Sequence, residues 1–323
     1  MSRRSWGLFA LVSLLWGVPY LFIKIAVVEL PPSWVVLTRL VLAAAVLVPI
    51  AWYRGALRPF RGRLGALTVQ GLLHVGIPFW LITAGEQYIG SGLAALLISS
   101  TPAMIAVIEL AVPPKNGSTE RLTWVRGTGL LVGLAGVALL VGPDASSENQ
   151  LLGTVMLLLA TAGYAVATVN ARRRFSDVPA LGLSTGTVLV GAVTMLPLAL
   201  TEIPTRLPSV NTMLAVAVLG TLCTAVAFVG FYALLKVAGP ARASVITYIS
   251  PLVAAGLGVA VLDEPLTGGL LAGSVLILTG SWLATRRPRA ARPAAERSGG
   301  LIPRQRGVQD RGSVREEPVP LAE

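Results

Sequence analysis

The residues of this sequence whose chemistry demands an explanation are ionisable side chains within long apolar runs. Lys24, Arg39, His74 and Glu109 each interrupt such a run. A charged group in an apolar medium is costly, so a residue kept there often serves an ion, a proton or a substrate. His74 and Glu109 are therefore candidate proton carriers, since an imidazole exchanges protons near neutral pH and a carboxyl can be tuned toward it.

Each of these residues also has a purely structural interpretation. Lys24 either draws anionic substrate groups inward or extends to the lipid headgroups. Arg39 either serves as a charge site or pairs with Glu86 or a helix-end carbonyl. His74 can hydrogen bond to a neighbouring helix, and Glu109 can reach the membrane interface. Glu86 itself is expected at the wet outer end of its apolar run.

Aromatic residues fall near the middle of several apolar runs. Together with His74 they predict a substrate cavity with a mixed apolar and polar lining, although lipid-facing or interfacial anchoring is the alternative for each. The set is Trp16, Tyr20, Trp80, Tyr164, Phe228, Tyr232 and Tyr248.

Two prolines, Pro102 and Pro251, lie inside apolar runs, each directly after a hydroxyl residue. A proline in mid-helix frees backbone carbonyls, which can bind ions or permit a hinge motion. A static kink that helps packing is the alternative.

The composition requires that all of these residues sit on membrane-spanning helices. The chain is 54% hydrophobic and 13% charged, whereas a soluble domain carries about 25% charged residues. A span needs about 20 apolar residues, which is too long for a barrel strand. We expect an all-α integral membrane protein with ten transmembrane helices, near 6–27, 33–53, 64–84, 91–112, 124–142, 151–170, 179–200, 211–235, 241–262 and 267–285.

Basic residues set the expected orientation. Nine of the 26 Lys and Arg residues follow Thr285, and most others fall in alternate loops. That asymmetry predicts cytoplasmic termini in a bacterial-type inner membrane and explains the net charge of +11 without nucleic acid. The segment 288–323 is predicted to be a disordered cytoplasmic tail.

The two halves of the sequence resemble each other. Residues 88–102 match 237–251 at an offset of 149, and Gly129 and Gly136 match Gly273 and Gly280 at an offset of 144. With five spans in each half, the second copy must enter the membrane from the opposite side. We therefore expect inverted repeats over 1–145 and 151–287, an arrangement typical of secondary transporters with a midplane site.

The chain carries an ordered series of short motifs: Trp16-Gly17 with Lys24, Pro32, Thr38-Arg39-Leu40, the Gly-Leu-Ala-Ala stretch before Thr101-Pro102, Ser250-Pro251, Glu264, Thr267, Gly273 and Gly280. In their order and spacing these motifs resemble the EamA-type branch of the drug/metabolite transporter superfamily over about residues 6–287. The sequence departs from the family at 112–117, where the loop before Glu120 is longer. The resemblance implies ten helices, cytoplasmic termini and exchange of small molecules, often by export.

The predicted function is a secondary transporter or facilitator that moves small metabolites, such as amino acids or drug-like and toxic compounds, by alternating access. The alternatives are an intramembrane lipid-modifying enzyme and a membrane scaffold. No nucleophile–base set, phosphate loop or metal cluster is recognisable, and Cys223 is the single cysteine, so we expect neither an enzyme nor a cofactor. The expected partners are a small-molecule substrate and the lipid bilayer, and a homodimer is left open.

Overall fold

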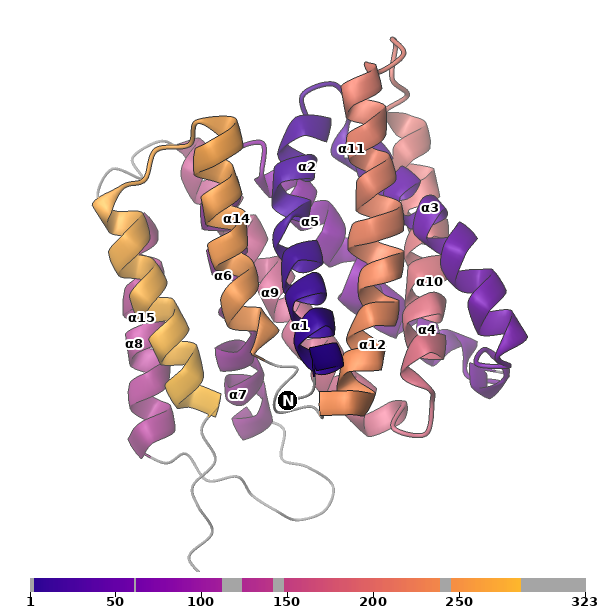
Figure 1. Cartoon of the computed structure of the whole chain (residues 1–323), viewed down its shortest axis with the longest axis horizontal. Coiled ribbons are helices and arrows are strands. Elements are labelled where there is room, and N and C mark those ends of the chain that lie inside the picture. The colour runs from indigo at the N-terminus through magenta and orange to yellow at the C-terminus, as the bar shows by residue number, and fades with distance from the viewer. Residues whose placement is uncertain (1–2, 61, 112–123, 142–147, 239–244, 286–323) are drawn as a thin grey trace, which may run out of the picture. The chain divides into compact units, whose positions relative to one another are not determined.

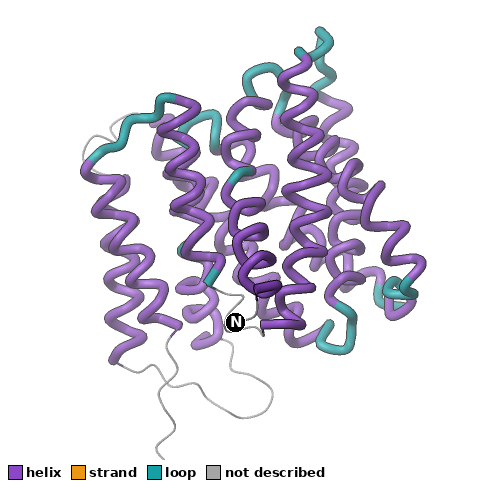
Figure 2. Tube along the Cα trace, in the orientation of Figure 1, coloured by secondary structure: helices purple, strands orange, loops and turns teal. Residues whose placement is uncertain are grey.

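A computed structural model describes residues 3–60, 62–111, 124–141, 148–238 and 245–285. These residues form helices and connecting turns, with no strand among them (Figure 2). Seven helical segments are long and apolar enough to cross a membrane, and three shorter apolar helices accompany them. The chain is thus an all-helical, multi-pass membrane protein. The segment 288–323 and the loop at 112–117 lie outside the described residues.

In the first half of the chain, backbone groups that hydrocarbon cannot solvate are paired within helices, as the bilayer requires. The first expected span is divided at Val18, where Pro19 begins a new helical segment (Figure 1). The elements are α1 (Arg3–Gly17), α2 (Pro19–Ala26), α3 (Pro32–Tyr53), η1 (Arg58–Phe60), α4 (Leu64–Gly71), η2 (Leu72–Gly76), α5 (Ile77–Gly85), α6 (Ser91–Ile98), α7 (Thr101–Ala111) and α8 (Trp124–Val141).

The second half of the chain continues in the same manner. Its first helix is longer than the expected 151–170, because Glu148 and Arg172–Arg174 extend it at both ends. The elements are α9 (Glu148–Arg174), α10 (Ala180–Thr201), α11 (Val210–Gly220), η3 (Thr221–Val226), α12 (Ala227–Ala238), α14 (Ile246–Leu262) and α15 (Gly268–Thr285).

Two of the apolar helices contain a widened, π-helical turn. The segment η2 joins α4 to α5, and η3 joins α11 to α12. Such turns add a residue to the helical repeat and are frequent at functional sites. Periodicity alone does not reveal them, since both lie within continuous apolar runs.

A further interruption separates α6 from α7. Pro102 has no N–H to offer the carbonyl of Ile98, four residues earlier. The Thr101 hydroxyl donates to that carbonyl instead, at 2.6 Å, and the Ser99 and Ser100 hydroxyls donate to the carbonyls of Leu96 and Leu97. The helix therefore ends without leaving these acceptors unpaired. Pro251, by contrast, lies within the continuous helix α14.

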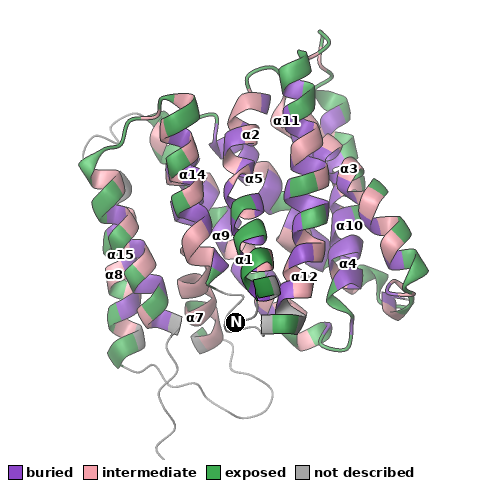
Figure 3. Cartoon of the chain, in the orientation of Figure 1, coloured by how far each residue is buried: buried purple, intermediate pink, exposed green. Residues whose placement is uncertain are grey.

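Close helix crossings rely on small residues, as expected where lipid removes the hydrophobic drive for association. Helices α8 and α15 lie side by side (Figure 1), and Gly280 faces the backbone of Gly129 and Gly133. Leucines on both helices, such as Leu131 on α8 and Leu271 on α15, are exposed, and Figure 3 shows exposed stretches along this pair. Exposed leucines of this kind are unfavourable in water but are covered by lipid when the helices lie in a membrane.

The glycine packing predicts a difference between two glycine-to-alanine substitutions. A Cβ at Gly280 would overlap the Gly133 backbone, whereas a Cβ at Gly256 meets no atom within 4 Å. Alanine gains about 1 kcal/mol of helix propensity at either site, but overpacking costs about 1–3 kcal/mol. Gly280→Ala should lower the melting temperature in detergent, and Gly256→Ala should preserve or raise it. Equal melting temperatures would contradict this packing.

Candidate functional site

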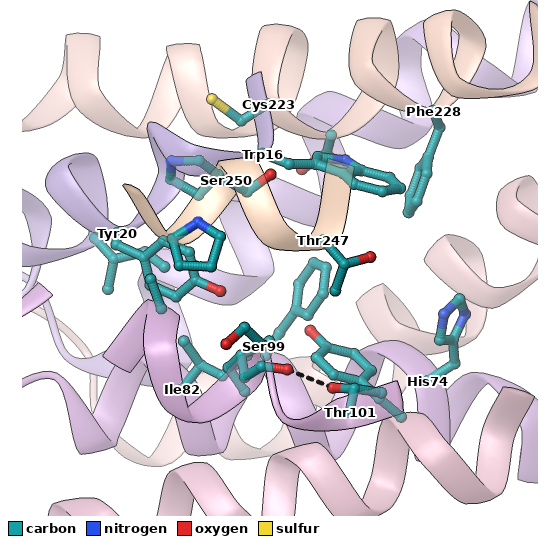
Figure 4. Close-up of a pocket in the computed structure, with 18 of the residues that line it drawn as sticks. Trp16, Tyr20, His74, Ile82, Ser99, Thr101, Cys223, Phe228, Thr247 and Ser250 are labelled. Carbon is teal, nitrogen blue, oxygen red and sulfur yellow. Dashed lines mark hydrogen bonds between the residues drawn. The ribbon is translucent and has the colours of Figure 1, made fainter. Parts of the chain in front are cut away.

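A cavity of about 300 Å³ opens among the helices, at the small end of the range for small-molecule sites. Residues from both halves of the chain form its walls. Five aromatic or imidazole residues from the sequence-based set belong to the lining, and Figure 4 shows four of them around a common space. The five are Trp16, Tyr20, His74, Tyr164 and Phe228.

The structure places the other expected cavity residues elsewhere or leaves them undescribed. Trp80 packs against the hydrophobic core that contains Val75 and Phe79. Tyr248 is partly buried on α14 and does not belong to the lining. The side chain of Tyr232 lies outside the described residues. An apolar run reveals that an aromatic residue is in mid-span, but it does not reveal which way the side chain points.

The two π-helical turns supply part of the polar wall of the cavity. His74 lies in η2, and Cys223 and Thr224 lie in η3. The Thr224 hydroxyl donates to the carbonyl of Leu219, five residues earlier, at 2.8 Å. The widened turn thus leaves a carbonyl for a side chain and brings that side chain to the cavity.

His74 meets an aromatic ring where a polar partner was expected. Its ring packs edge-on to Tyr164, with 5.9 Å between the ring centroids. Its Nδ1 atom is buried and has no hydrogen-bond partner among the described residues. The expected hydrogen bond from His74 to a neighbouring helix is therefore not made by Nδ1.

Arg39 carries the ionised group of the described cavity wall. It is 7% exposed, and its Nε–H donates to the Thr224 hydroxyl at 2.9 Å. The guanidinium carbon lies 4.2 Å from the centre of the Phe79 ring, a cation–π contact. The expected pairing with Glu86 or a helix-end carbonyl is replaced by Thr224, which the sequence placed in a distant span.

Lys24 and Glu86 form a separate polar group outside the cavity lining. The Lys24 ammonium donates to the carbonyls of Glu86 and Ile89, at 2.5 and 2.8 Å. The two roles expected for Lys24, attraction of anionic groups and extension to the headgroups, stay predictions beside this contact. Glu86 is fully buried, contrary to its expected wet position, and its carboxyl oxygens have no hydrogen-bond partner among the described residues.

Glu109 pairs with an arginine outside the cavity lining. Its carboxylate accepts a 2.6 Å bond from Arg172, and the Glu109 side chain is 29% exposed. This ion pair links α7 to α9 and leaves Glu109 out of the lining. A partly exposed, paired carboxylate is a poor candidate for a central proton carrier.

Several cavity residues were not expected from the sequence because they are ordinary hydroxyl residues in apolar runs. Their polarity shows only when the fold turns them toward one space. The set is Ser99, Thr101, Thr168, Thr224, Thr247 and Ser250. Two of the six, Thr101 and Ser250, could have been noticed in the sequence, because each directly precedes a mid-run proline, Pro102 or Pro251. Pro251 itself lines the cavity, and Pro102 does not.

A carboxylate outside the cavity lining joins two helices of the bundle. Glu264 accepts hydrogen bonds from the Ser91 backbone N–H at 2.7 Å, the Ser91 hydroxyl at 3.0 Å and the Gly92 N–H at 3.2 Å. These donors lie in the first turn of α6, where unpaired N–H groups and the helix dipole favour an anion. The contact ties the end of α14 to α6.

This contact predicts a measurable coupling between Glu264 and Ser91. Hydrogen bonds to a charged group contribute about 1.5–3 kcal/mol. Glu264→Ala and Ser91→Ala should each lower the melting temperature in detergent, and the double variant should lose less than the sum. Thr128→Ala, at an exposed hydroxyl on α8, serves as the control. Strict additivity of the two losses would refute the interaction.

Among the described residues, no group of three His, Cys, Asp or Glu side chains could hold a metal ion. A bundle of membrane-spanning helices around a mainly apolar cavity with a few polar groups is the form of a small-molecule membrane transporter. The chain belongs to the EamA-like transporter family, whose model matches residues 4–142 and 151–286.

Curated relatives, among them a protein named as a transporter, match the chain over most of its length. The chain is 29% identical over 295 residues to the uncharacterized inner membrane transporter YedA of Escherichia coli, covering 88% of this chain and 94% of YedA. It is 30% identical over 254 residues to the protein PagO of Salmonella typhimurium, covering 77% and 82%. A crystal structure with 23% identity superposes with a TM-score of 0.61, covering 88% of this chain and 97% of that one. This last likeness supports the fold.

Proposed function

We propose that this protein is a secondary transporter or facilitator that exports small metabolites across the cytoplasmic membrane by alternating access. The observation that carries the proposal is the cavity, whose walls come from both halves of a chain in a transporter family. The cavity holds both aromatic surfaces and hydroxyl groups, which suits amphipathic compounds.

Alternating access in the proposal rests on two inverted five-helix repeats with ten spans in all. The two π-helical turns support this repeat, because η2 begins at Leu72 and η3 at Thr221, an offset of 149. Pro49 within α3 and Pro197 within α10 occupy corresponding positions at an offset of 148. Two unrelated apolar halves would share hydrophobicity but not the positions of such irregular features, so the matches favour a repeat.

Helix crossings on either side of the cavity support the same repeat. A Cβ at Gly71 would meet Val190 and the carbonyl of Thr187 on α10. A Cβ at Gly220 would meet Leu42 and the carbonyl of Arg39 on α3. The two contacts are related by offsets of 148 and 149, so each half packs on the other in the same way. Rocking about these crossings is the motion that the proposal requires.

Cytoplasmic termini are part of the proposal. Ion pairs bring the expected cytoplasmic segments together, because Arg63 binds Asp177 and Arg172 binds Glu109. The Arg63 guanidinium holds the pKa of the Asp177 carboxyl below its usual value. Expected outer segments meet in turn, since Ser33 donates to Glu202 at 2.6 Å. In this proposal the end of the bundle that carries Arg63 and Arg172 faces the cytoplasm, as the excess of basic residues there predicts.

Obstruction of the cavity tests the transport proposal. Thr247 lines the cavity, and Thr247→Trp would fill space that a substrate needs. Val193, 69% exposed on α10, gives the matched control Val193→Trp. Purified protein in proteoliposomes should exchange radiolabelled compounds from a panel of amino acids, organic acids and cationic dyes. We expect Thr247→Trp to reduce exchange at least about tenfold, a loss of about 1.4 kcal/mol, and Val193→Trp to preserve it.

Two results would contradict the proposal. One is exchange by Thr247→Trp at the wild-type rate, with wild-type folding, because the compound would then travel by another route. The other is the absence of exchange for every compound of the panel in wild-type proteoliposomes.

A further inference from the structure

We propose that Arg39 binds the carboxylate of the transported compound, so that the substrates are small organic acids with an apolar body. This inference rests on the proposed function and gives it a substrate class. Arg39 is the ionised side chain of the described cavity lining, which contains no Asp, Glu or Lys. The cavity therefore presents a positive charge that no acidic side chain of the described lining pairs with.

The hydrogen bond from Arg39 to Thr224 orients the guanidinium. The single proton of the Thr224 hydroxyl is donated to the carbonyl of Leu219. The hydroxyl oxygen must then accept the proton of Arg39 Nε, at 2.9 Å. This arrangement uses the inner edge of the guanidinium and leaves its two terminal nitrogens for another partner. Those two nitrogens form the end-on fork that binds a carboxylate through two parallel bonds.

The Phe79 ring restricts the guanidinium further. With the guanidinium carbon 4.2 Å from the ring centre, one face of the planar group is covered. The side chain is 7% exposed, so little water is available to solvate the charge. A guanidinium held on one edge and one face is already organised for a ligand, which reduces the entropy lost on binding.

No internal counter-ion occupies the fork of Arg39. Among the described residues, no carboxylate oxygen lies within 4.0 Å of it. The acidic residue that interacts with Arg39 electrostatically is Glu86. The Lys24 ammonium also lies beside Glu86, because it donates to the Glu86 backbone carbonyl. A buried cation without a partner is costly. An anionic ligand that supplies the missing partner gains more here than it would at an exposed arginine.

The remaining lining defines the body of the ligand. Trp16 and Phe228 pack edge to face, with 6.4 Å between ring centroids, and Tyr20 and Tyr164 add two more rings. These surfaces favour an apolar or aromatic group in the space beyond Arg39. The volume of about 300 Å³ limits the ligand to a small molecule.

A matched pair of probes tests the charge requirement on the wild-type protein. The probes are 3-phenylpropionate and its neutral amide, 3-phenylpropanamide, which share the apolar body. Binding to the full-length protein in detergent is measured by titration calorimetry. We expect the acid to bind at least about tenfold more tightly than the amide, since tenfold corresponds to about 1.4 kcal/mol, within the range of a charged hydrogen bond.

Substitutions at Arg39 assign the preference to this residue. Arg39→Gln should reduce the acid-to-amide preference to about twofold or less, below about 0.5 kcal/mol. Arg39→Lys should retain part of it, because the ammonium keeps the charge but not the fork. Arg63→Gln removes an exposed arginine that pairs with Asp177 outside the cavity lining, and should keep the full preference. Ligand-free melting temperatures report whether each variant folds.

The inference is overturned if the wild-type protein binds the acid and the amide equally, or binds neither. It is also overturned if folded Arg39→Gln keeps the wild-type preference. Should Arg39→Gln fail to fold, the wild-type pair and Arg39→Lys still decide the question. Exchange of neutral or cationic compounds that Thr247→Trp blocks would leave the transport proposal standing while the substrate class falls.

Discussion

The structure depends on one constraint, which is that backbone groups inside a bilayer must find partners within the protein. Regular helices satisfy it by themselves. At two of the places where a helix departs from regularity, a hydroxyl side chain takes the freed carbonyl: Thr101 does so for Ile98 and Thr224 for Leu219. Both of these hydroxyl residues line the cavity. The irregular turns and the cavity are therefore two results of the same local chemistry.

That chemistry also sets the electrostatics of the cavity. Thr224 can orient Arg39 because its own proton is already committed to the backbone. Without the π-helical turn in η3, the hydroxyl would have the usual acceptor four residues earlier and a different direction. A change in one helical turn thus determines where the buried positive charge points, and the charge in turn determines which substrates gain from entering.

Much of the fold follows from the sequence, since apolar run length and punctuation residues placed the helices to within a few residues. What the sequence could not supply was rotation of each helix about its axis. Trp16 and Trp80 look alike in their apolar runs, yet Trp16 lines the cavity and Trp80 packs in the core. Glu86 was expected in water and is buried, because burial depends on neighbouring helices that are distant in sequence. The hydroxyl lining was missed for the same reason.

The central claim is that the cavity is the path of the substrate and opens to each side of the membrane in turn. Cys223 is the single cysteine of the chain and lies in the cavity wall, so the native protein carries its own probe. The most direct measurement is its labelling by a membrane-impermeant methanethiosulfonate in right-side-out and inside-out vesicles, with Cys223→Ser as the blank. The account predicts labelling from both sides. Labelling from one side alone under every condition, or none before unfolding, would contradict it.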